Sequence, residues 1–423
     1  MRNTESNFVD DTTSRVSETT LGNGLRVVTE RLSGSLSAAI GVWIAVGSRD
    51  ENVRLSGASH CLEHLLFKGT ETRSARDVAE AVDRVGGDMN AFTAREYTAF
   101  YARVPATSFD MAADLLFDVI RRPAFRERDV ESERQVILEE LVAAEDTPDD
   151  LVHMALYESL FTGHPLGRDV LGNHESIAAL QPHDIADFHA EHYRPTNMVV
   201  AAAGNVDHAA VVRYATEHFG DLPTGVAPSR NAPLPGTPTQ QHARLPVEQM
   251  HVALGWRSLP HGDPDRFALA LANTVLGGSP SSRLFQQIRE EQGLAYTVFS
   301  STSSYADTGT ATVYAATSAR RGAELLRSLR DEIDRAVSGG MTADEIDMAR
   351  DGFKGSVVLG LEDSSSRMSR LATGHALRGR VTPLEEFFEN LDAVTLEDVS
   401  RVLDRVFGTE PTVSIVGPDG PIG

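Results

Sequence analysis

Three residues in the first quarter of the chain have the types and spacing of a metal site. His60, Glu63 and His64 read H-x-x-E-H, the reverse of the H-E-x-x-H order of many zinc hydrolases. On a helix, residues four apart lie on one face, so the two histidines can hold one ion. Glu63 lies beside them, where it can act as the base for a metal-activated water. The motif supplies two ligands and a general base.

The sequence around the motif favours a helix. A turn-like Ser56-Gly57 precedes it, and Lys68-Gly69-Thr70 follows as a helix end with a cation and a glycine. The alternatives are a chance match and a buried helix whose histidines are structural. The remaining helix faces can be buried by apolar residues, namely Leu62, Leu65, Leu66 and Phe67.

A catalytic zinc normally takes three protein ligands, so a third must come from elsewhere. Residues 127–141 have the apolar spacing of a helix. Glu133 and Glu140 are seven residues apart and share a half-apolar face, where a carboxylate needs a positive partner. The neighbouring acids, including Glu139, fit a solvated helix. The residue pattern alone does not choose among these carboxylates.

The segments around His60–His64 and Glu140 resemble the inverted-motif zinc metallopeptidases, or inverzincins, of the pitrilysin and insulinase family, and most closely the processing-peptidase branch. The likeness extends from Thr20 to the end of the chain. It implies that Glu140 completes the site for one Zn²⁺ per chain and that Glu133 supports the site without binding metal. Cys61 is a departure, because the family usually carries a large apolar residue there.

The resemblance also implies a substrate clamp in the second half. Arg289 and Tyr296, seven residues apart across a helix end at Gly293, match a family pair that reaches toward the zinc-bound substrate. Arginine can hold a carbonyl group, and tyrosine can donate to a developing oxyanion. Hydrolysis would then need both halves to close on the peptide. Without the resemblance, a surface arginine and a core tyrosine fit equally well.

A second substrate contact is expected at residues 89–94, a short strand-like run after Gly86-Gly87. A strand at a sheet edge can bind an extended peptide through main-chain hydrogen bonds. The family uses the equivalent run in this way, which points to Asn90 and Ala91. An ordinary interior strand would fit the same residue types.

The chain is expected to have an α+β fold with two similar halves, each a mainly antiparallel sheet flanked by helices, facing each other across a chamber. Strand-like runs ending in Trp43 and Trp256 begin the repeat. The second half has no His-Glu-His on its matching helix, and Val357 stands opposite Glu140. The expected boundaries are a flexible tail (1–18), a zinc-binding half (19–222), a Pro-rich linker (223–245) and a non-metal half (246–423).

Composition limits the partners. The formal net charge is −22, which argues against nucleic acid. No apolar run is long enough for a membrane helix, and the first residues lack the pattern of a signal or transit peptide. A single cysteine suits a reducing cytoplasm, which is the expected location. Lys68 and Lys354 are the only lysines, so arginine supplies nearly all the positive charge.

The sequence therefore predicts a zinc-dependent endopeptidase that hydrolyses peptides or unfolded protein segments, with Glu63 as general base. The processing-peptidase likeness suggests a homodimer, or a heterodimer with a related chain. Two other functions stay open: a non-catalytic assembly or binding subunit of the same fold, and a zinc hydrolase acting on a non-peptide amide.

Overall fold

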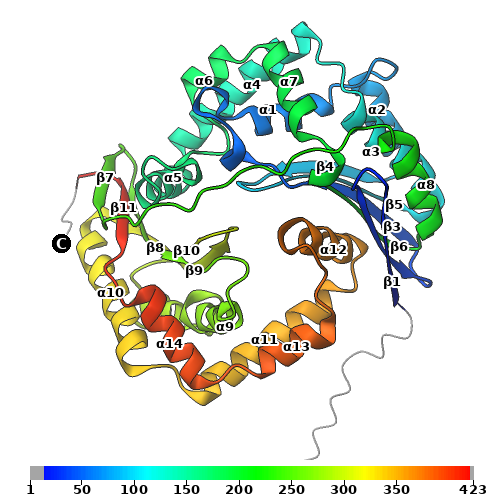
Figure 1. Cartoon of the computed structure of the whole chain (residues 1–423). Coiled ribbons are helices and arrows are strands. Elements are labelled where there is room, and N and C mark those ends of the chain that lie inside the picture. The colour runs from blue at the N-terminus through cyan, green and yellow to red at the C-terminus, as the bar shows by residue number, and fades with distance from the viewer. Residues whose placement is uncertain (1–13, 420–423) are drawn as a thin grey trace, which may run out of the picture.

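The computed structural model describes residues 14–419, which form two mixed β-sheets on opposite sides of the molecule (Figure 1). The six strands of the first sheet lie in the order β1 (Ser14–Thr20), β2 (Arg26–Leu32), β6 (Met198–Gly204), β3 (Ser37–Ile44), β5 (Thr98–Pro105) and β4 (Asp88–Thr93). The second sheet has the order β7 (Gln240–Arg244), β11 (Thr412–Gly417), β8 (Gln249–Ser258), β10 (Gly309–Ser318) and β9 (Thr297–Ser304).

The two sheets repeat one topology. The order β2-β6-β3-β5-β4 matches β7-β11-β8-β10-β9, and in each sheet only the first of these pairs is parallel. Trp43 and Trp256 lie in the corresponding strands β3 and β8. The predicted α+β fold with two similar, mainly antiparallel halves is confirmed. The strands β4 and β9 are the equivalent edge strands.

Helices cover both sheets. No helix in residues 14–419 is long and apolar enough to cross a membrane. The helices of the first half are α1 (Ala58–Leu66), α2 (Ala75–Asp83), α3 (Phe109–Arg121), α4 (Glu127–Asp146), α5 (Pro148–Leu160), α6 (His174–Ala179), α7 (Pro182–His192) and α8 (His208–Phe219). Those of the second half are α9 (Arg266–Gly277), a π-helix (Phe285–Glu291), α10 (Gly322–Gly339), α11 (Ala343–Gly360), α12 (Ser364–Arg378), α13 (Leu384–Asp392) and α14 (Leu396–Phe407).

The halves exchange one helix each. Helix α5 follows helix α4 in the first half of the sequence but packs on the second sheet, where Val152 and Leu156 are buried with Ala253 of β8. Helix α12 packs in turn on the first sheet, where Met368 is buried with Trp43 of β3. Each sheet therefore depends on a helix from the other half, and the sequence boundaries do not mark separate structural units.

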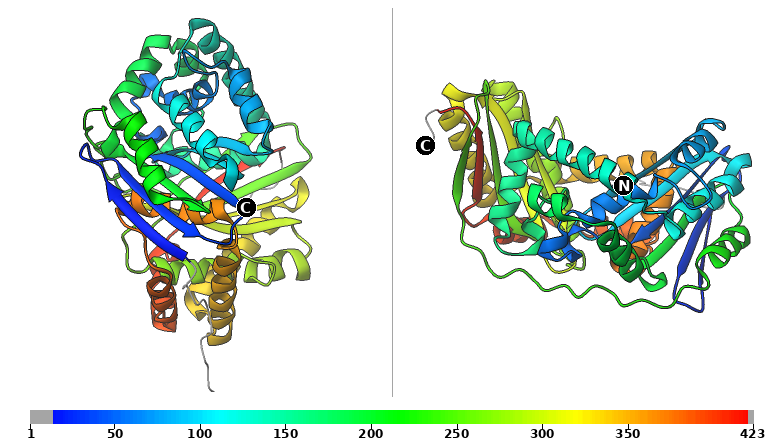
Figure 2. Two further views of the ribbon diagram at one scale, coloured as in Figure 1. Left: turned by 90° about the vertical axis from the view of Figure 1, so that its right-hand side faces the viewer. Right: turned by 90° about the horizontal axis from the view of Figure 1, so that it is seen from above.

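Two of the expected boundaries differ from the structure. Residues 223–239 contain no helix or strand and run along the outside of the molecule from α8 to β7 (Figure 2). The predicted linker extends to residue 245, but residues 240–244 form β7, because they pair in parallel with β11. Likewise, residues 14–18 of the predicted tail belong to β1, which pairs with β2. The rest of that tail, residues 1–13, lies outside the described residues.

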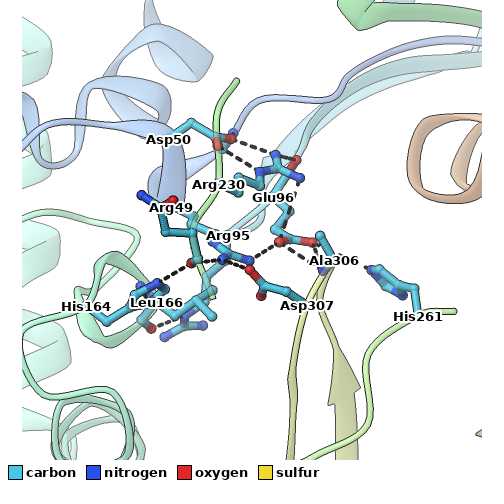
Figure 3. Close-up of polar contacts among 12 residues, drawn as sticks. Arg49, Asp50, Arg95, Glu96, His164, Leu166, Arg230, His261, Ala306 and Asp307 are labelled. Atoms are coloured by element: carbon cyan, nitrogen blue, oxygen red, sulfur yellow. Dashed lines mark hydrogen bonds and ion pairs between the residues drawn. The ribbon is translucent and has the colours of Figure 1, made fainter. Parts of the chain in front are cut away.

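A buried cluster of charged residues joins the two halves (Figure 3). Arg49, 4% exposed, donates to Glu96 in the β4–β5 turn at 2.5 Å and to Asp307 in the β9–β10 turn at 2.6 Å. The Glu96 carboxylate also accepts from the N–H of Ala306 at 2.9 Å. Breaking such a cluster leaves an uncompensated buried charge, which is strongly unfavourable. The tips of the two equivalent edge hairpins are therefore held together.

The segment that connects the halves is fixed to the same cluster. Arg230 donates to both carboxylate oxygens of Asp50, at 2.8 and 2.7 Å, and to the carbonyl oxygen of Glu96 at 2.8 Å. The next residue, Asn231, accepts from Arg49 at 2.8 Å through its carbonyl oxygen. The first half, the second half and the segment between them thus meet at one set of charges.

A second buried ion group fixes α12 and gives a test of the helix exchange. Glu30 of β2, 1% exposed, pairs with Arg367 and Arg370 of α12. Glu30→Gln is expected to lower the free energy of unfolding by about 3 kcal/mol, because two arginines lose their shared counter-ion in a buried interface. Urea unfolding measures the change. The control Glu386→Gln, which breaks an exposed pair with Arg380, should change stability little; equal effects would contradict the importance of this contact.

Candidate metal centre

The start of α1 is fixed by its surroundings. Gly57 has φ +89°, and a Cβ there would lie 2.6 Å from the carbonyl oxygen of Leu171, so only glycine fits. The buried Glu51 carboxylate accepts from the N–H groups of Gly57 and Ser59, each at 2.7 Å. These bonds satisfy two N–H groups that a helix start leaves free. The apolar side of α1 is buried in the first core through Cys61, Leu62, Leu65 and Leu66.

The structure brings His60, His64 and Glu140 together. One ligand atom from each lies within 4.8 Å of the others. Glu140 Oε2 is 4.0 Å from His60 Nε2 and 3.7 Å from His64 Nε2. A tetrahedral zinc with bonds of about 2.0–2.1 Å holds its ligand atoms about 3.3 Å apart, so small side-chain shifts would close this set on one ion. Within residues 14–419 this is the one such cluster of potential metal ligands.

The geometry separates the two adjacent glutamates of α4. Glu140 points Oε2 toward the histidines, and that buried atom has no hydrogen-bond partner. Glu139 is exposed. A buried carboxylate oxygen without a donor is costly unless a cation is bound there. The donor set of two imidazoles and one carboxylate is also one that zinc accepts, so the residues fit the metal that the sequence implied.

The two histidines differ in their surroundings. Burial, with a smaller contribution from His64, lowers the pKa of His60 to about 4, which keeps its imidazole neutral as a metal ligand requires. His64 Nδ1 lies 3.1 Å from Glu133 Oε2. A carboxylate on Nδ1 fixes the ring orientation and leaves Nε2 for the metal. The structure thus brings Glu133 into contact with the trio, in the supporting position expected from the sequence.

Glu63 lies on α1 next to both histidines and contacts the edge strand β4. Thr93 Oγ1, at the end of β4, donates to Glu63 Oε2 at 2.6 Å. Burial raises the pKa of Glu63 above its ordinary value, and the Thr93 bond and the charge of His64 partly offset this. A half-buried carboxyl with a raised pKa, held by one hydrogen bond, suits a group that accepts and returns a proton.

The expected peptide-binding strand β4 is at the edge of its sheet. Its one partner in the described chain is β5. The N–H of Ala91 donates to the side chain of Asn90 at 2.8 Å. Asn90 is exposed, so its side chain can be displaced by an added strand. The edge location fits the predicted use of Asn90 and Ala91, and their role stays a prediction.

The structure does not bring Arg289 and Tyr296 to the metal trio. Arg289 donates to the carbonyl oxygen of Tyr296 at 3.1 Å, and its guanidinium lies over the Tyr296 ring. Tyr296 is 77% exposed and directly precedes β9. It is ten residues before Ala306, which lies in the β9–β10 turn at the opposite end of that strand. At about 3.3 Å per residue, this places it roughly 30 Å from the joined hairpin tips, whereas Thr93 is only about 10 Å from them. The clamp role stays a prediction.

Sequence reasoning missed two contacts of this centre. Thr93 lies two residues after Ala91, so strand alternation places it on the same face of β4, toward α1. Glu51 stands six residues before Gly57, and its carboxyl is buried behind α1. Burial raises the pKa of Glu51 to about 8, and the hydrogen bonds from the N–H groups of Ser59 and Gly57 partly offset this.

Cys61 is buried as well, and burial raises the pKa of its thiol to about 12, so it stays protonated and unreactive.

Comparison with known proteins decides the family. A family model described as insulinase, peptidase family M16, matches residues 26–174, which contain the whole metal trio. An uncharacterized zinc protease of Mycobacterium tuberculosis is 43% identical over 407 residues, which cover 95% of this chain and 93% of the relative. The chain belongs to peptidase family M16. The resemblance noted from the sequence is thereby confirmed.

Two further relatives match along nearly the whole chain. An uncharacterized zinc protease of Streptomyces coelicolor is 45% identical over 412 residues, covering 95% of this chain and 90% of the relative. Among solved structures, a protease from Helicobacter pylori superposes with a TM-score of 0.87 at 25% identity and covers 95% of this chain and 99% of its own. The two-half architecture is therefore shared by this solved protease along nearly its whole length.

A second family model matches the middle of the chain, from the end of the first half into the second half. Residues 179–353 fit a model described as the peptidase M16 inactive domain. Helix α9 takes the place of α1 after the corresponding strand and contains no histidine or glutamate. A chain of complex III from Candida albicans shares the fold with a TM-score of 0.82 at 21% identity, over 95% of this chain and 96% of its own. The M16 fold is thus also found in a large assembly, and the metal trio must carry the functional argument.

Proposed function

We propose that this M16 protein is a zinc-dependent endopeptidase that cleaves peptides or unfolded protein segments. The observation that carries the proposal is the approach of His60, His64 and Glu140 to one point, with Glu63 beside it on the same helix. The relatives named zinc proteases are consistent with this reading. One bound Zn²⁺ would polarise the scissile carbonyl and lower the pKa of a water molecule.

The chain's own residues would do the remaining work. Glu63 accepts a proton from the attacking water at its carboxylate and returns it to the leaving amine. Thr93 keeps that carboxylate oriented through its 2.6 Å bond. The free edge of β4 at Asn90 and Ala91 holds the substrate backbone in extended form, a mode that selects unfolded segments over folded ones. Glu133 keeps the His64 ring in place.

The oxyanion would be stabilised by Tyr296, with Arg289 on the substrate carbonyl groups. These residues lie before the start of β9, at the end of the strand that is away from the β9–β10 turn. The cluster around Arg49 and Glu96 holds the tips of the two hairpins together, so it keeps Arg289 and Tyr296 away from Glu63 of the same chain. We therefore infer that the clamp is supplied by a second copy of the chain in a symmetric homodimer, in which each protomer completes the other's site.

A non-catalytic assembly subunit is the second candidate, because the same fold occurs in complex III of Candida albicans. Such a subunit has no need of a carboxylate that directs a buried oxygen without a hydrogen-bond partner at two histidines. The presence of that arrangement favours the peptidase. A non-peptide amidase is not favoured by any feature of the site.

Metal content tests the proposal. The purified protein is expected to hold one zinc per chain by elemental analysis and to cleave a quenched fluorescent peptide library, with activity lost to a chelator and restored by Zn²⁺. Glu140→Gln should lose the metal and the activity, because one ligand is removed. The matched control is Glu139→Gln, an exposed neighbour that should keep both. A protein without stoichiometric metal, or equal effects of the two substitutions, would contradict the assigned centre.

A further inference from the structure

Lys68, two residues beyond the end of α1, contacts the support of the metal trio. Its Nζ is 2.5 Å from Oε1 of Glu133, a side chain that is only 5% exposed. The other oxygen of that carboxylate, Oε2, lies 3.1 Å from Nδ1 of His64. Glu133 therefore uses one oxygen for an ammonium group and the other for an imidazole.

The ammonium limits how the buried carboxylate can turn. A desolvated carboxylate is costly unless both oxygens have donors, so without Lys68 it would rotate toward another donor or toward water. With Oε1 held by Lys68, Oε2 stays directed at His64. The imidazole Nε2 then keeps its direction toward Glu140, 3.7 Å away.

The residue type fits this task. The chain has 39 lysines and arginines, and only Lys68 and Lys354 are lysines. An ammonium is a compact point donor that can occupy a single oxygen, whereas a guanidinium tends to take both oxygens of a carboxylate in a fork. An arginine at this position would compete with His64 for Oε2 of Glu133.

We propose that Lys68 is a positioning residue of the metal centre: it fixes the Glu133 carboxylate, which in turn fixes the His64 imidazole for the metal. The inference rests on the proposed zinc site. Among the described residues Lys68 forms its ion pair with Glu133 and none with Glu140, so its effect on the metal trio must pass through Glu133, and this dependence can be measured.

The experiment is a double-mutant cycle on zinc release. Full-length protein loaded with zinc is mixed with a chromogenic chelator, and the release rate is followed for wild type, Lys68→Met, Glu133→Gln and the double variant. Lys68→Met should release zinc about tenfold faster, in line with the loss of a supporting contact. In the Glu133→Gln background the same substitution should have no further effect. Lys354→Met, which breaks an ion pair with the exposed Asp392, is the control and should leave release unchanged.

The metal-free protein gives an independent readout. Nitrogen NMR of ¹⁵N-histidine-labelled protein reports which ring nitrogen of His64 carries the proton. In wild type this should be mainly Nδ1, which faces Glu133, and the Nδ1–H fraction should fall in Lys68→Met. Unchanged zinc release in Lys68→Met, or an equal change with and without Glu133, would overturn the proposal. Lys68→Gln gives the same comparison if the methionine variant does not fold. If wild type holds no zinc, the proposed function itself fails, which is distinct from zinc-loaded protein that is indifferent to Lys68.

Discussion

Glu63→Gln is expected to lower kcat for peptide hydrolysis by roughly 10²–10⁴-fold while the protein keeps its zinc. Glutamine has nearly the same shape and can still accept the hydrogen bond that Thr93 donates to Glu63 at 2.6 Å. It cannot take a proton from water at neutral pH. Steady-state cleavage of a quenched peptide, together with zinc analysis of the same sample, measures both properties.

The control for Glu63→Gln is Glu80→Gln, which removes an exposed carboxylate of α2 that pairs with Arg76. That variant should keep wild-type kcat. A Glu63→Gln protein that cleaves at the wild-type rate would show that another group acts as base. A variant that loses its zinc as well would instead place Glu63 among the ligands, which the convergence of Glu140 with the two histidines does not suggest.

The sequence predicted the parts of this site that depend on local geometry. His60 and His64 are four apart, and helical periodicity alone puts them on one face of α1. The choice of Glu140 over Glu139 was different, because it depends on how α4 lies against α1. That choice came from the family resemblance, and the packing of the two helices now supplies a physical reason.

Contacts between residues that are far apart in the sequence could not be predicted from local patterns. Thr93 and Glu63 are separated by 30 residues, and Arg49 and Asp307 by 258. The packing of α5 and α12 on the opposite sheets could not be predicted either, since an apolar helix face does not specify which sheet covers it. The predicted linker includes β7, and local patterns do not reveal this strand, because a polar edge strand with one partner lacks the alternation that marks half-buried strands.

The contact between the two hairpin tips also changes how the two halves are expected to bind a substrate. Closure of one half on the other was the sequence-based expectation. The structure has Arg49 and Glu96 buried between the hairpin tips, with the half-buried Asp307 paired to Arg49, so a large opening would expose or unpair several charges. A clamp from a second copy needs no such opening. This leads to a prediction that distinguishes the two arrangements.

A heterodimer of the inactive variants Glu63→Gln and Tyr296→Phe is expected to recover activity, because its intact Glu63 and its intact Tyr296 lie on different chains and can form one complete site. Glu63→Gln lacks the base, and Tyr296→Phe lacks the oxyanion donor, whose loss should cost roughly 10²–10³-fold in kcat. In a symmetric dimer that shares its sites, pairing the two variants leaves one intact site of two, hence about half the wild-type kcat per dimer. The two chains are co-expressed with different tags and purified in sequence, and peptide cleavage is measured.

The reciprocal heterodimer makes the test decisive. Wild type paired with the double variant Glu63→Gln/Tyr296→Phe has no intact shared site, so its activity should be close to background. If Tyr296 serves the Glu63 of its own chain, both results reverse: the first heterodimer stays inactive and the second keeps about half the activity. Because both heterodimers contain the same set of substitutions, differences in stability cannot imitate the result. The pair of measurements therefore reports only which chain supplies the tyrosine.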